Sequence, residues 1–336
     1  MGSKTNAKQV ALAAGVSPAT VDRVLNGRGG VSPEKERLVL HWARQLRLDR
    51  SLTHRPARTL RIAVLLQGPQ NPFHMAGQQA FAQLLPHYRH LNMALAFFHA
   101  DPNDHEAGAR LIERAGERHD GLIITYPSSE RIVAAINRQA ARVPVLTFAT
   151  DIPESARHAY IGPDDCKAGR IAGELMGRLL PAGGDILVVA GLMHMTGQAD
   201  RVEGFRAVIA ERYPDCRILR IVESRESQER AGRLVDEALR RQPDLAGIYN
   251  ASTGAQAIAE ALAAHGRSRE TMFITHELTA NRRRLVREGL VDAIIDQDVE
   301  HGARLAIETM ARLTGRLEGE AVSIFTPTHI HMRENV

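Results

Sequence analysis

Polar side chains follow the predicted strands of the long C-terminal part of the chain, each where an apolar run ends. They are Gln67, Asn71, Tyr126, Thr150, Asp151, Asp164, His194, Asn250, His276, Glu277 and Gln297, and the aromatic Phe73 lies beside Asn71. In open parallel sheets, ligands bind outside the carboxyl ends of the strands. Amides and carboxylates pair well with hydroxyl groups, and an aromatic ring can stack on the apolar face of a sugar. The set therefore predicts a site for a hydroxyl-rich ligand.

The elements that would position these side chains begin near Leu60, where apolar runs start to alternate with amphipathic helical stretches. This alternation is typical of parallel sheets covered on both faces, and the number of runs suits two sheets rather than one. The predicted strands span residues 61–66, 91–98, 121–125, 145–147, 159–161, 185–190, 217–221, 247–250, 272–275 and 292–296. The predicted helices span residues 75–85, 106–117, 129–140, 168–180, 198–211, 226–240, 253–265, 281–288 and 301–314.

A second distinctive stretch lies near the N-terminus, where residues 8–26 predict two short helices that meet at a Gly-Val-Ser turn. Asn6 can cap the first helix, and Gly15 can end it in a left-handed conformation. Ser17 and Pro18 can start the second helix. Two short helices joined by such a turn, and braced by a third, predict a small all-α helix-turn-helix domain. A generic helical hairpin is the alternative.

Charge is distributed unevenly along the chain. Residues 1–60 hold 11 Lys/Arg and 4 Asp/Glu, whereas the remaining residues hold 32 and 35. A basic head on a slightly acidic body indicates an anionic polymer partner, which for a helix-turn-helix is double-stranded DNA. Two distant cysteines, Cys166 and Cys216, favour a reduced, cytoplasmic protein. No signal peptide or membrane-spanning run is expected.

The head also carries a family resemblance. The pattern AxxAGVSxxTVxRVLNGxxxVSxxxxRxV, from Ala11 to Val39, resembles the DNA-binding head of the lactose-repressor (LacI/GalR) family of bacterial regulators. The resemblance implies a DNA-binding domain over residues 1–48 with a recognition helix at residues 18–25. It implies base-edge contacts from Pro18, Ala19 and Arg23, and phosphate contacts from Asn6, Ser17, Thr20 and Asn26. Of the base readers, only Arg23 can make a bidentate pair with guanine.

Two features of this region depart from the family. Asp22 stands where a serine is usual, and it would either accept a hydrogen bond from cytosine or face solvent. In the link, residues 49–60, the family's hinge helix usually ends on a leucine that kinks the DNA. The matching stretch Ser51–Ala57 keeps only Arg55 and contains a proline, which limits a helix. We expect Arg50, Arg55 and Arg58 to enter a narrow minor groove or hold phosphates, although an ordinary basic linker is the alternative.

Residues 61–336 resemble the periplasmic sugar-binding-protein-like body of the same family, which joins ligand binding and dimerisation. The motifs are Asn71-Pro72-Phe73, Asp164-Asp165 through Gly173, Arg201-x-x-Gly204-Phe205 and Glu288-Gly289 through Gln297. The resemblance implies an α/β body of two doubly wound parallel-sheet lobes with a ligand cleft between them. Lobe one would comprise about 61–161 plus 297–322, and lobe two about 162–294 plus 323–336. The chain would cross between lobes near Gly162, residues 294–297 and Ser323.

Carried over position by position, the family's ligand contacts fall on Asn71, Phe73, Thr150, Arg201, Asn250, His276, Glu277 and Gln297, and Asp151 follows Thr150 at the same strand end. Ala149-Thr150, His74 and His276-Glu277 depart from the usual residues of sugar binders, which suits a sugar acid, a polyol or a phosphorylated sugar, or reflects packing variation. Structural alternatives remain for several positions: a turn start at Asn71, core packing for Phe73, a buried ion pair for Arg201, a satisfied structural histidine for His276 and a crossover cap for Gln297.

Head, basic link and cleft-type body together predict a homodimeric, ligand-responsive transcriptional regulator, specifically a repressor of a carbohydrate or polyol catabolic operon. Two heads on a two-fold axis would bind a palindromic operator. A sugar, polyol or sugar acid in the cleft would favour one lobe angle and so change DNA affinity. The rivals are a solute-binding protein without DNA regulation and a DNA-binding regulator with a degenerate pocket.

We expect neither catalysis nor a cofactor nor a metal site. The 15 histidines show no helical i, i+4 ligand pair with a nearby carboxylate, as a hydrolytic zinc site would need. The sequence also lacks a phosphate-cradling loop and a serine nucleophile elbow.

Overall fold

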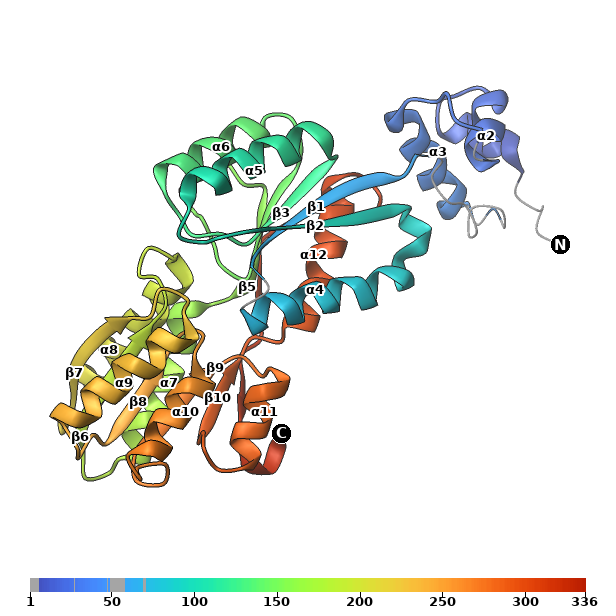
Figure 1. Ribbon diagram of the computed structural model, residues 1–336. Coiled ribbons are helices and arrows are strands. Elements are labelled where there is room, and N and C mark those ends of the chain that lie inside the picture. The colour runs from blue at the N-terminus through green and yellow to red at the C-terminus, as the bar shows by residue number, and fades with distance from the viewer. Residues whose placement is uncertain (1–5, 27, 47, 49–57, 69–70) are drawn as a thin grey trace.

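The computed structural model describes residues 6–26, 28–46, 48, 58–68 and 71–336. A small helical head lies beside the upper of two lobes, and the lower lobe lies at the far end of the molecule (Figure 1). Most of the predicted link, including Arg50 and Arg55, lies outside the described residues, so the contacts expected of it stay predictions. No helix of the described ranges is long and apolar enough to cross a membrane.

The head consists of three helices, and the predicted caps position the first two. The Asn6 side chain accepts hydrogen bonds from two N–H groups in the first turn of its helix, and Ser17 accepts one from Thr20. Gly15 adopts the left-handed φ of 62° between these helices, and buried valines and alanines from all three form the core. The helix-turn-helix prediction is confirmed with α1 Ala7–Ala13, α2 Pro18–Leu25 and α3 Pro33–Gln45.

The first lobe is a six-stranded sheet in the order β11-β5-β4-β3-β1-β2, with parallel pairing throughout. Helices α4 and α12 cover one face, and α5 and α6 cover the other, which is why the strands read as continuous apolar runs. Its elements are β1 Leu60–Gln67, α4 Pro72–Leu84, the 3-10 helix η2 Leu85–Leu91, β2 Met93–Ala100, α5 His105–Arg118, β3 Gly121–Ile124, α6 Glu130–Ala140, β4 Val145–Phe148, β5 Ala159–Pro163, α12 Val299–Leu313 and β11 Ile324–Thr326.

The second lobe repeats this plan in the order β12-β10-β9-β8-β6-β7, but its edge strand β12 runs antiparallel to β10. Helices α7 and α8 pack on one face, and α9, α10 and α11 on the other. Its elements are α7 Asp165–Leu179, β6 Gly184–Ala190, α8 Thr196–Arg212, β7 Cys216–Glu223, α9 Gln228–Arg241, β8 Gly247–Asn250, α10 Ala255–Ala264, β9 Met272–His276, α11 Ala280–Arg287, β10 Ala293–Asp296 and β12 His329–His331, with the 3-10 helix η3 Arg333–Asn335 at the end.

Gly169 brings α7 and α8 into close contact. A Cβ atom at this position would overlap the carbonyl oxygen of Arg201 on α8. The small residue therefore allows the backbone of α8 to lie directly against α7, and this contact fixes where the Arg201 side chain begins.

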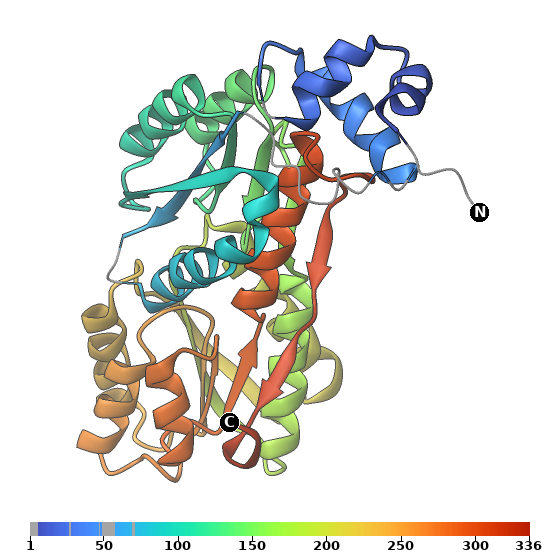
Figure 2. The same ribbon diagram turned by 90° about the vertical axis from the view of Figure 1, so that its right-hand side faces the viewer.

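The chain passes between the lobes after β5, after β10 and after β11, and Figure 2 shows the last passage running along the side of both lobes. The third crossing, predicted near Ser323, lies slightly further along the chain. Residues 324–326 still pair with β5 of the first sheet, and the Ser323 hydroxyl accepts a hydrogen bond from the N–H of Tyr160 at 2.9 Å. The chain leaves the first lobe only after Thr326, because these bonds complete that sheet's edge.

Candidate functional site

The exposed face of α2 carries the residues predicted to read bases. Pro18, Ala19 and Arg23 are all exposed. The Arg23 guanidinium lies back over the turn that follows the helix, where its Nε donates to the carbonyl oxygen of Gly29 at 3.0 Å. Arg23 therefore has to leave this contact before it can extend toward a base edge.

The predicted phosphate-contacting residues already take part in local hydrogen bonds. Asn6 and Ser17 cap their helices, and the Ser17 and Thr20 hydroxyls lie 2.9 Å apart. Asn26 donates to the Asp22 carboxylate at 2.6 Å, and Arg28 forms an ion pair with the same carboxylate at 2.9 Å. Asp22 thus holds the residues that follow the recognition helix. The sequence had suggested only a contact with cytosine or exposure to solvent for this side chain.

The described end of the link is fixed to the first lobe. Arg58 forms an ion pair with Asp120, and the Arg58 carbonyl accepts from Arg316 at 2.6 Å. On the head itself, His41 of α3 lies 2.9 Å from Glu318 in the loop after α12. Arg58 is therefore engaged by the body in this arrangement and does not point away as a free basic group.

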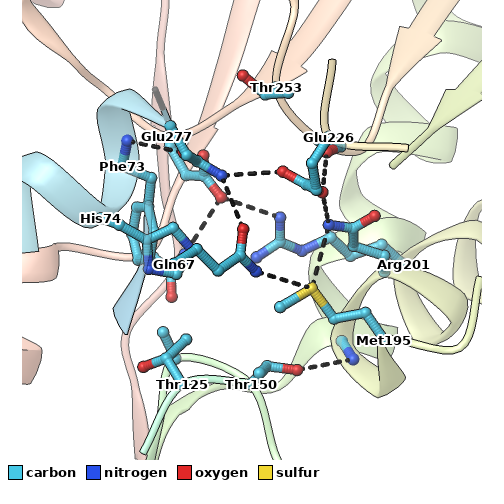
Figure 3. A pocket seen from close by; sticks show the side chains of 16 residues that line it. Gln67, Phe73, His74, Thr125, Thr150, Met195, Arg201, Glu226, Thr253 and Glu277 are labelled. Carbon is cyan, nitrogen blue, oxygen red and sulfur yellow. Dashed lines mark hydrogen bonds and ion pairs between the residues drawn. The ribbon is translucent and has the colours of Figure 1, made fainter. Parts of the chain in front are cut away.

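A polar cavity lies between the two lobes, at the carboxyl ends of their strands (Figure 3). Six of the predicted ligand residues line it, namely Asn71, Phe73, Thr150, Arg201, Glu277 and Gln297. Phe73 also belongs to the core of the first lobe, so its ring serves both core and cavity wall. The remaining lining residues are Gln67, His74, Thr125, Ala149, Met195, Gly197, Gln198, Glu226, Ser252 and Thr253.

Three predicted ligand residues lie behind the walls of the cavity, and the structure does not bring them to it. Asp151 forms a bidentate ion pair with Arg157 and accepts from Thr147. Asn250 is fully buried and donates to the Thr275 hydroxyl and the Ser252 carbonyl. These strand-end side chains satisfy internal partners, so the expectation that they contact ligand is corrected.

His276 is the third of these residues. Its Nε2 lies 2.7 Å from the Tyr249 hydroxyl, inside the core of the second lobe. Burial lowers the pKa of His276 well below its ordinary value, and the charges of Arg201 and Arg282 lower it further. The structure therefore supports the alternative of a satisfied structural histidine.

Arg201 anchors a buried charge network at the floor of the cavity. Its Nε lies 2.6 Å from Asp165, and its Nη1 lies 3.2 Å from Glu277. Arg282 approaches the other Glu277 oxygen at 3.1 Å. Burial alone would raise the pKa of Glu277, but Arg282 and Arg201 outweigh it and hold that pKa below its usual value. Arg201 thus lines the cavity and also forms a buried ion pair. The ligand contact and the buried ion pair that the sequence offered as alternatives are therefore compatible.

Two sequence families match this chain. A family described as bacterial regulatory proteins, lacI family, matches residues 6–47, and one described as periplasmic binding protein domain matches residues 62–320. Together they cover the head and the two-lobed body that the structure shows. The chain belongs to the LacI family of bacterial regulatory proteins.

Relatives of this LacI-family chain include the D-ribose/D-allose-binding protein of Pseudomonas aeruginosa, which is 22% identical over 226 residues, or 63% of this chain and 69% of that one. A glucose-galactose binding protein, GanP, from Geobacillus stearothermophilus has a TM-score of 0.75 at 21% identity, covering 83% of this chain and 99% of its own. A LacI transcriptional regulator from Bacteroides fragilis has a TM-score of 0.72 at 20% identity, covering 83% and 98%. At these identities the structures share the fold.

Sequence reasoning missed Glu226, which extends into the cavity of this LacI-family body from the loop after β7. Its carboxylate accepts from Gln198 at 2.5 Å, from Ser252 at 2.7 Å and from Asn71 of the first lobe at 2.9 Å. The sequence predicted that a helix starts at Glu226, but Ser227 caps that helix instead. The rule that ligands bind at the carboxyl ends of parallel strands also applies to β7, and it could have directed attention to this loop.

His74 lines the cavity as a neutral side chain. It is buried, and its Nδ1 has no hydrogen-bond partner among the described residues. Burial lowers the pKa of His74 to about 4, with Glu277 opposing and His99 adding to the shift. His74 therefore offers an uncharged ring nitrogen to the cavity at neutral pH.

Several hydrogen bonds join the two lobes across the cavity and leave little free space. Besides the Asn71–Glu226 contact, the Gly197 N–H donates to the Thr150 hydroxyl at 3.2 Å, and the Gln67 amide lies 3.8 Å from the Met195 sulfur (Figure 3). The free volume is about 40 Å³. A cavity of this size holds a few water molecules, so a larger ligand has to replace some of these contacts.

Backbone strain is concentrated at this site. Ala149, Glu226 and Glu277 all line the cavity and have left-handed φ values of 62°, 61° and 65°. Non-glycine residues adopt this conformation rarely, at a cost of about 1–3 kcal/mol each, and such residues cluster at functional sites. Surrounding contacts therefore hold these three residues in an unfavourable backbone conformation, and this conformation orients their side chains in the cavity.

Proposed function

We propose that this chain is a sequence-specific DNA-binding repressor of a carbohydrate or polyol catabolic operon, whose operator affinity changes when a small effector binds in the interlobe cavity. The observation that carries the proposal is the joining, in one chain, of an exposed recognition helix and a polar cavity closed by hydrogen bonds between two lobes. The protein acts in the cytoplasm as a homodimer.

On the DNA side, two heads related by a two-fold axis contact a palindromic operator. Helix α2 enters the major groove, where Arg23 reads guanine and Pro18 and Ala19 contact apolar base edges. Asn6, Ser17, Thr20 and Asn26 hold phosphates and so fix the register. Arg50 and Arg55 of the link add contacts to the minor groove or to phosphates.

On the effector side, the chemistry of the cavity supports a polyhydroxylated ligand. Amide, carboxylate, hydroxyl and guanidinium groups surround the space, and the Phe73 ring lines it. A relative named for ribose and allose resembles this chain in sequence, and one named for glucose and galactose shares its fold. A ligand that binds one lobe arrangement more tightly than the other shifts the population toward that arrangement. Because β1 starts directly after the link, the lobe angle is coupled to the position of the head.

The decisive experiment measures DNA binding by the full-length protein through fluorescence anisotropy, with the DNA upstream of its own gene as the probe. Specific binding that survives about 150 mM salt, and that changes when one sugar or polyol from a broad panel is added, supports the proposal. Absence of specific binding to this DNA would contradict the regulatory role.

A regulator whose cavity takes no ligand is the second candidate. The small free volume and the hydrogen bonds across the cavity favour it. Thermal unfolding against sugars, polyols and sugar acids separates the two candidates, because a saturating ligand of the native state raises the melting temperature. Specific DNA binding without any such shift would favour the second candidate.

A further inference from the structure

Among the described lining residues, Glu226 is the one acidic or basic side chain other than His74 that forms no ion pair, and burial raises the pKa of its carboxyl group. Its three hydrogen-bond donors, Asn71, Gln198 and Ser252, are all neutral. Arg225 precedes it in the chain, and both residues line a neighbouring depression, but Arg225 forms no ion pair with Glu226 and does not line this cavity. Acidic side chains withdrawn from water are normally paired with a cation. The cavity therefore contains a carboxyl group for which the described residues supply hydrogen-bond donors but no positively charged partner.

The arginines that line the cavity or lie directly behind its wall are already paired with carboxylates. Arg201 is the only Lys or Arg among the described lining residues, and its guanidinium contacts both Asp165 and Glu277. Arg282 lies behind the wall and pairs with the second Glu277 oxygen. His74 is neutral at physiological pH, because burial lowers its pKa to about 4. An anionic ligand would find no unpaired cation here, and it would face two carboxylates.

The backbone holds Glu226 firmly in this position. Arg225 and Glu226 are consecutive non-glycine residues with left-handed φ values of 54° and 61°. A Cβ atom at Gly191 would overlap the Glu226 carboxylate, so the strand end after β6 leaves room for it. The carboxylate reaches the lobe boundary, where its Oε2 accepts a hydrogen bond from the Asn71 amide of the other lobe.

We propose that the effector is an amino sugar or a similar polyhydroxylated amine, whose ammonium group binds Glu226, and that sugar acids and sugar phosphates are rejected. This inference rests on the proposed function of the cavity and specifies its ligand class. The ammonium group supplies several donors and the missing charge, so it replaces the Asn71 amide at Glu226 when the lobes admit the ligand. The hydroxyl groups of the ligand pair with the neutral amide and hydroxyl groups of the walls.

The test compares three series of probes on the full-length protein by isothermal titration calorimetry at pH 7. The first series contains glucosamine, galactosamine and mannosamine, the second glucose, galactose and mannose, and the third glucuronate and galacturonate. A charge-assisted hydrogen bond contributes about 1.5–3 kcal/mol, so at least one amino sugar should bind about 10- to 100-fold more tightly than its neutral parent. The uronates should show no binding.

The variant Glu226→Gln tests the assigned residue, because it removes the charge and keeps an amide of the same shape. We expect it to weaken binding of the amino sugar by about 10-fold or more and to leave the neutral parent within about threefold. Glu203→Gln, an exposed position on α8, is the matched control and should change neither. Unchanged melting temperature of the ligand-free Glu226→Gln protein shows that the comparison is between folded proteins.

The possible outcomes separate this inference from the function beneath it. A neutral sugar or a uronate that binds as tightly as the amino sugars, or an amino-sugar preference that survives in Glu226→Gln, overturns the inference and leaves a carbohydrate effector in place. Absence of binding by all three series, and of any thermal shift with a wider polyol panel, overturns the effector role of the cavity and the inference with it.

Discussion

We expect specific DNA recognition to depend most on Arg23. Its neighbours on the exposed face of α2, Pro18 and Ala19, can offer only apolar contacts. In the DNA-free protein its guanidinium is held by the Gly29 carbonyl, and this contact has to break before Arg23 reaches a base. The acceptor of that bond is a neutral carbonyl at the surface. The free energy needed to break it is therefore small compared with the free energy gained from a bidentate pair with guanine.

We expect Arg23→Ala to weaken operator binding by about 1–3 kcal/mol, or roughly 5- to 150-fold, and to leave weak, salt-sensitive binding to unrelated DNA. Fluorescence anisotropy with operator and scrambled duplexes measures both affinities. Arg233→Ala, on an exposed face of α9 in the far lobe, is the control. Equal losses on both duplexes would show that Arg23 contacts phosphate and does not read a base.

Arg201 illustrates a different property of single residues, the cost of breaking a buried charge network. Replacement by methionine fills most of the space but leaves Asp165 without its cation and Glu277 with only Arg282. We expect Arg201→Met to lower the free energy of unfolding by about 3–5 kcal/mol, as for other buried pairs that lose one partner. Urea unfolding at pH 7 measures the change. The exposed control Arg233→Met should stay within about 0.5 kcal/mol of the wild type, and a similarly small effect of Arg201→Met would argue against the network's role.

His74 makes stability depend on acid pH. Its folded-state pKa of about 4 lies below the ordinary 6.5, so between these values the unfolded chain binds a proton that the folded chain does not. Stability contributed by the neutral ring is present above pH 6.5 and is lost as the pH falls through this window, at about 1.4 kcal/mol per pH unit.

The variant His74→Gln should therefore lose about 1.5 kcal/mol less free energy of unfolding than the wild type between pH 6.5 and pH 5. Urea midpoints at the two pH values measure the difference, and the exposed His87→Gln serves as control. His276 is also buried and neutral, so part of the acid sensitivity should persist in the variant. A slope identical to the wild type would place the titrating group elsewhere.

At the scale of elements, the start of α4 joins helix stability to lobe closure. Asn71 caps this helix by accepting from the Phe73 N–H at 3.0 Å, and its amide nitrogen donates to Glu226 of the other lobe. One side chain thus performs a local and a long-range task, using its acceptor for the helix and its donor for the cavity.

Asn71→Asp separates these tasks, because aspartate caps a helix as well as asparagine does but places a carboxylate against Glu226. We expect the melting temperature to change little and the ligand-free protein to favour an open lobe arrangement. Small-angle X-ray scattering should then give a larger radius of gyration than the wild type, whereas the exposed control Asn103→Asp should match the wild type. An unchanged radius would mean that other cross-lobe contacts are sufficient for closure.

The element scale also shows what the sequence could and could not reveal. Caps and hydrophobic periodicity identified the head helices and most of the lobe elements, because both depend on residues close together in the chain. The third crossing was misplaced because the three-residue strand β11 is defined by its pairing with β5, far away in sequence. Short edge strands carry too few residues for a pattern.

The same reasoning explains the partial success at the cavity. The positions of the strand ends predicted that Asn71, Thr150 and Glu277 lie at the cavity, and all three line it. The position of a residue at a strand end does not determine the direction in which its side chain points. Asn250 and His276 point into the core. Glu226 was missed because a left-handed glutamate in a loop has no sequence signature, and only the surrounding tertiary contacts hold it there.

At the scale of the whole molecule, the head contacts the lobe that also forms one wall of the cavity. The His41–Glu318 contact and the Arg58–Asp120 ion pair join head and link to the first lobe. The second lobe carries Arg201, Glu226 and Glu277, and within the described residues it is joined to the head only through the first lobe. The cavity thus takes one wall from each lobe, whereas the head is attached to the first lobe alone among the described residues.

Dimeric operator binding makes a prediction at this scale. Scrambling one half of the palindromic operator should leave one head on specific bases and the other on phosphates alone. We expect affinity to fall most of the way to the non-specific value, a loss of about 4 kcal/mol or more. Anisotropy titrations with intact, half-scrambled and fully scrambled duplexes measure it. A half-scrambled site that binds like the intact one would show that a single head is sufficient.

The placement of the three passages between lobes has a consequence for how such proteins diversify. The described chain enters the second lobe after β5, leaves it after β10 and returns after β11. Recombination at these junctions exchanges the half of the binding site that holds Arg201, Glu226 and Glu277 without altering the recognition helix. A new metabolite can then be coupled to an old promoter by inheriting one lobe, and chimaeras built at these junctions are a practical route to new biosensors.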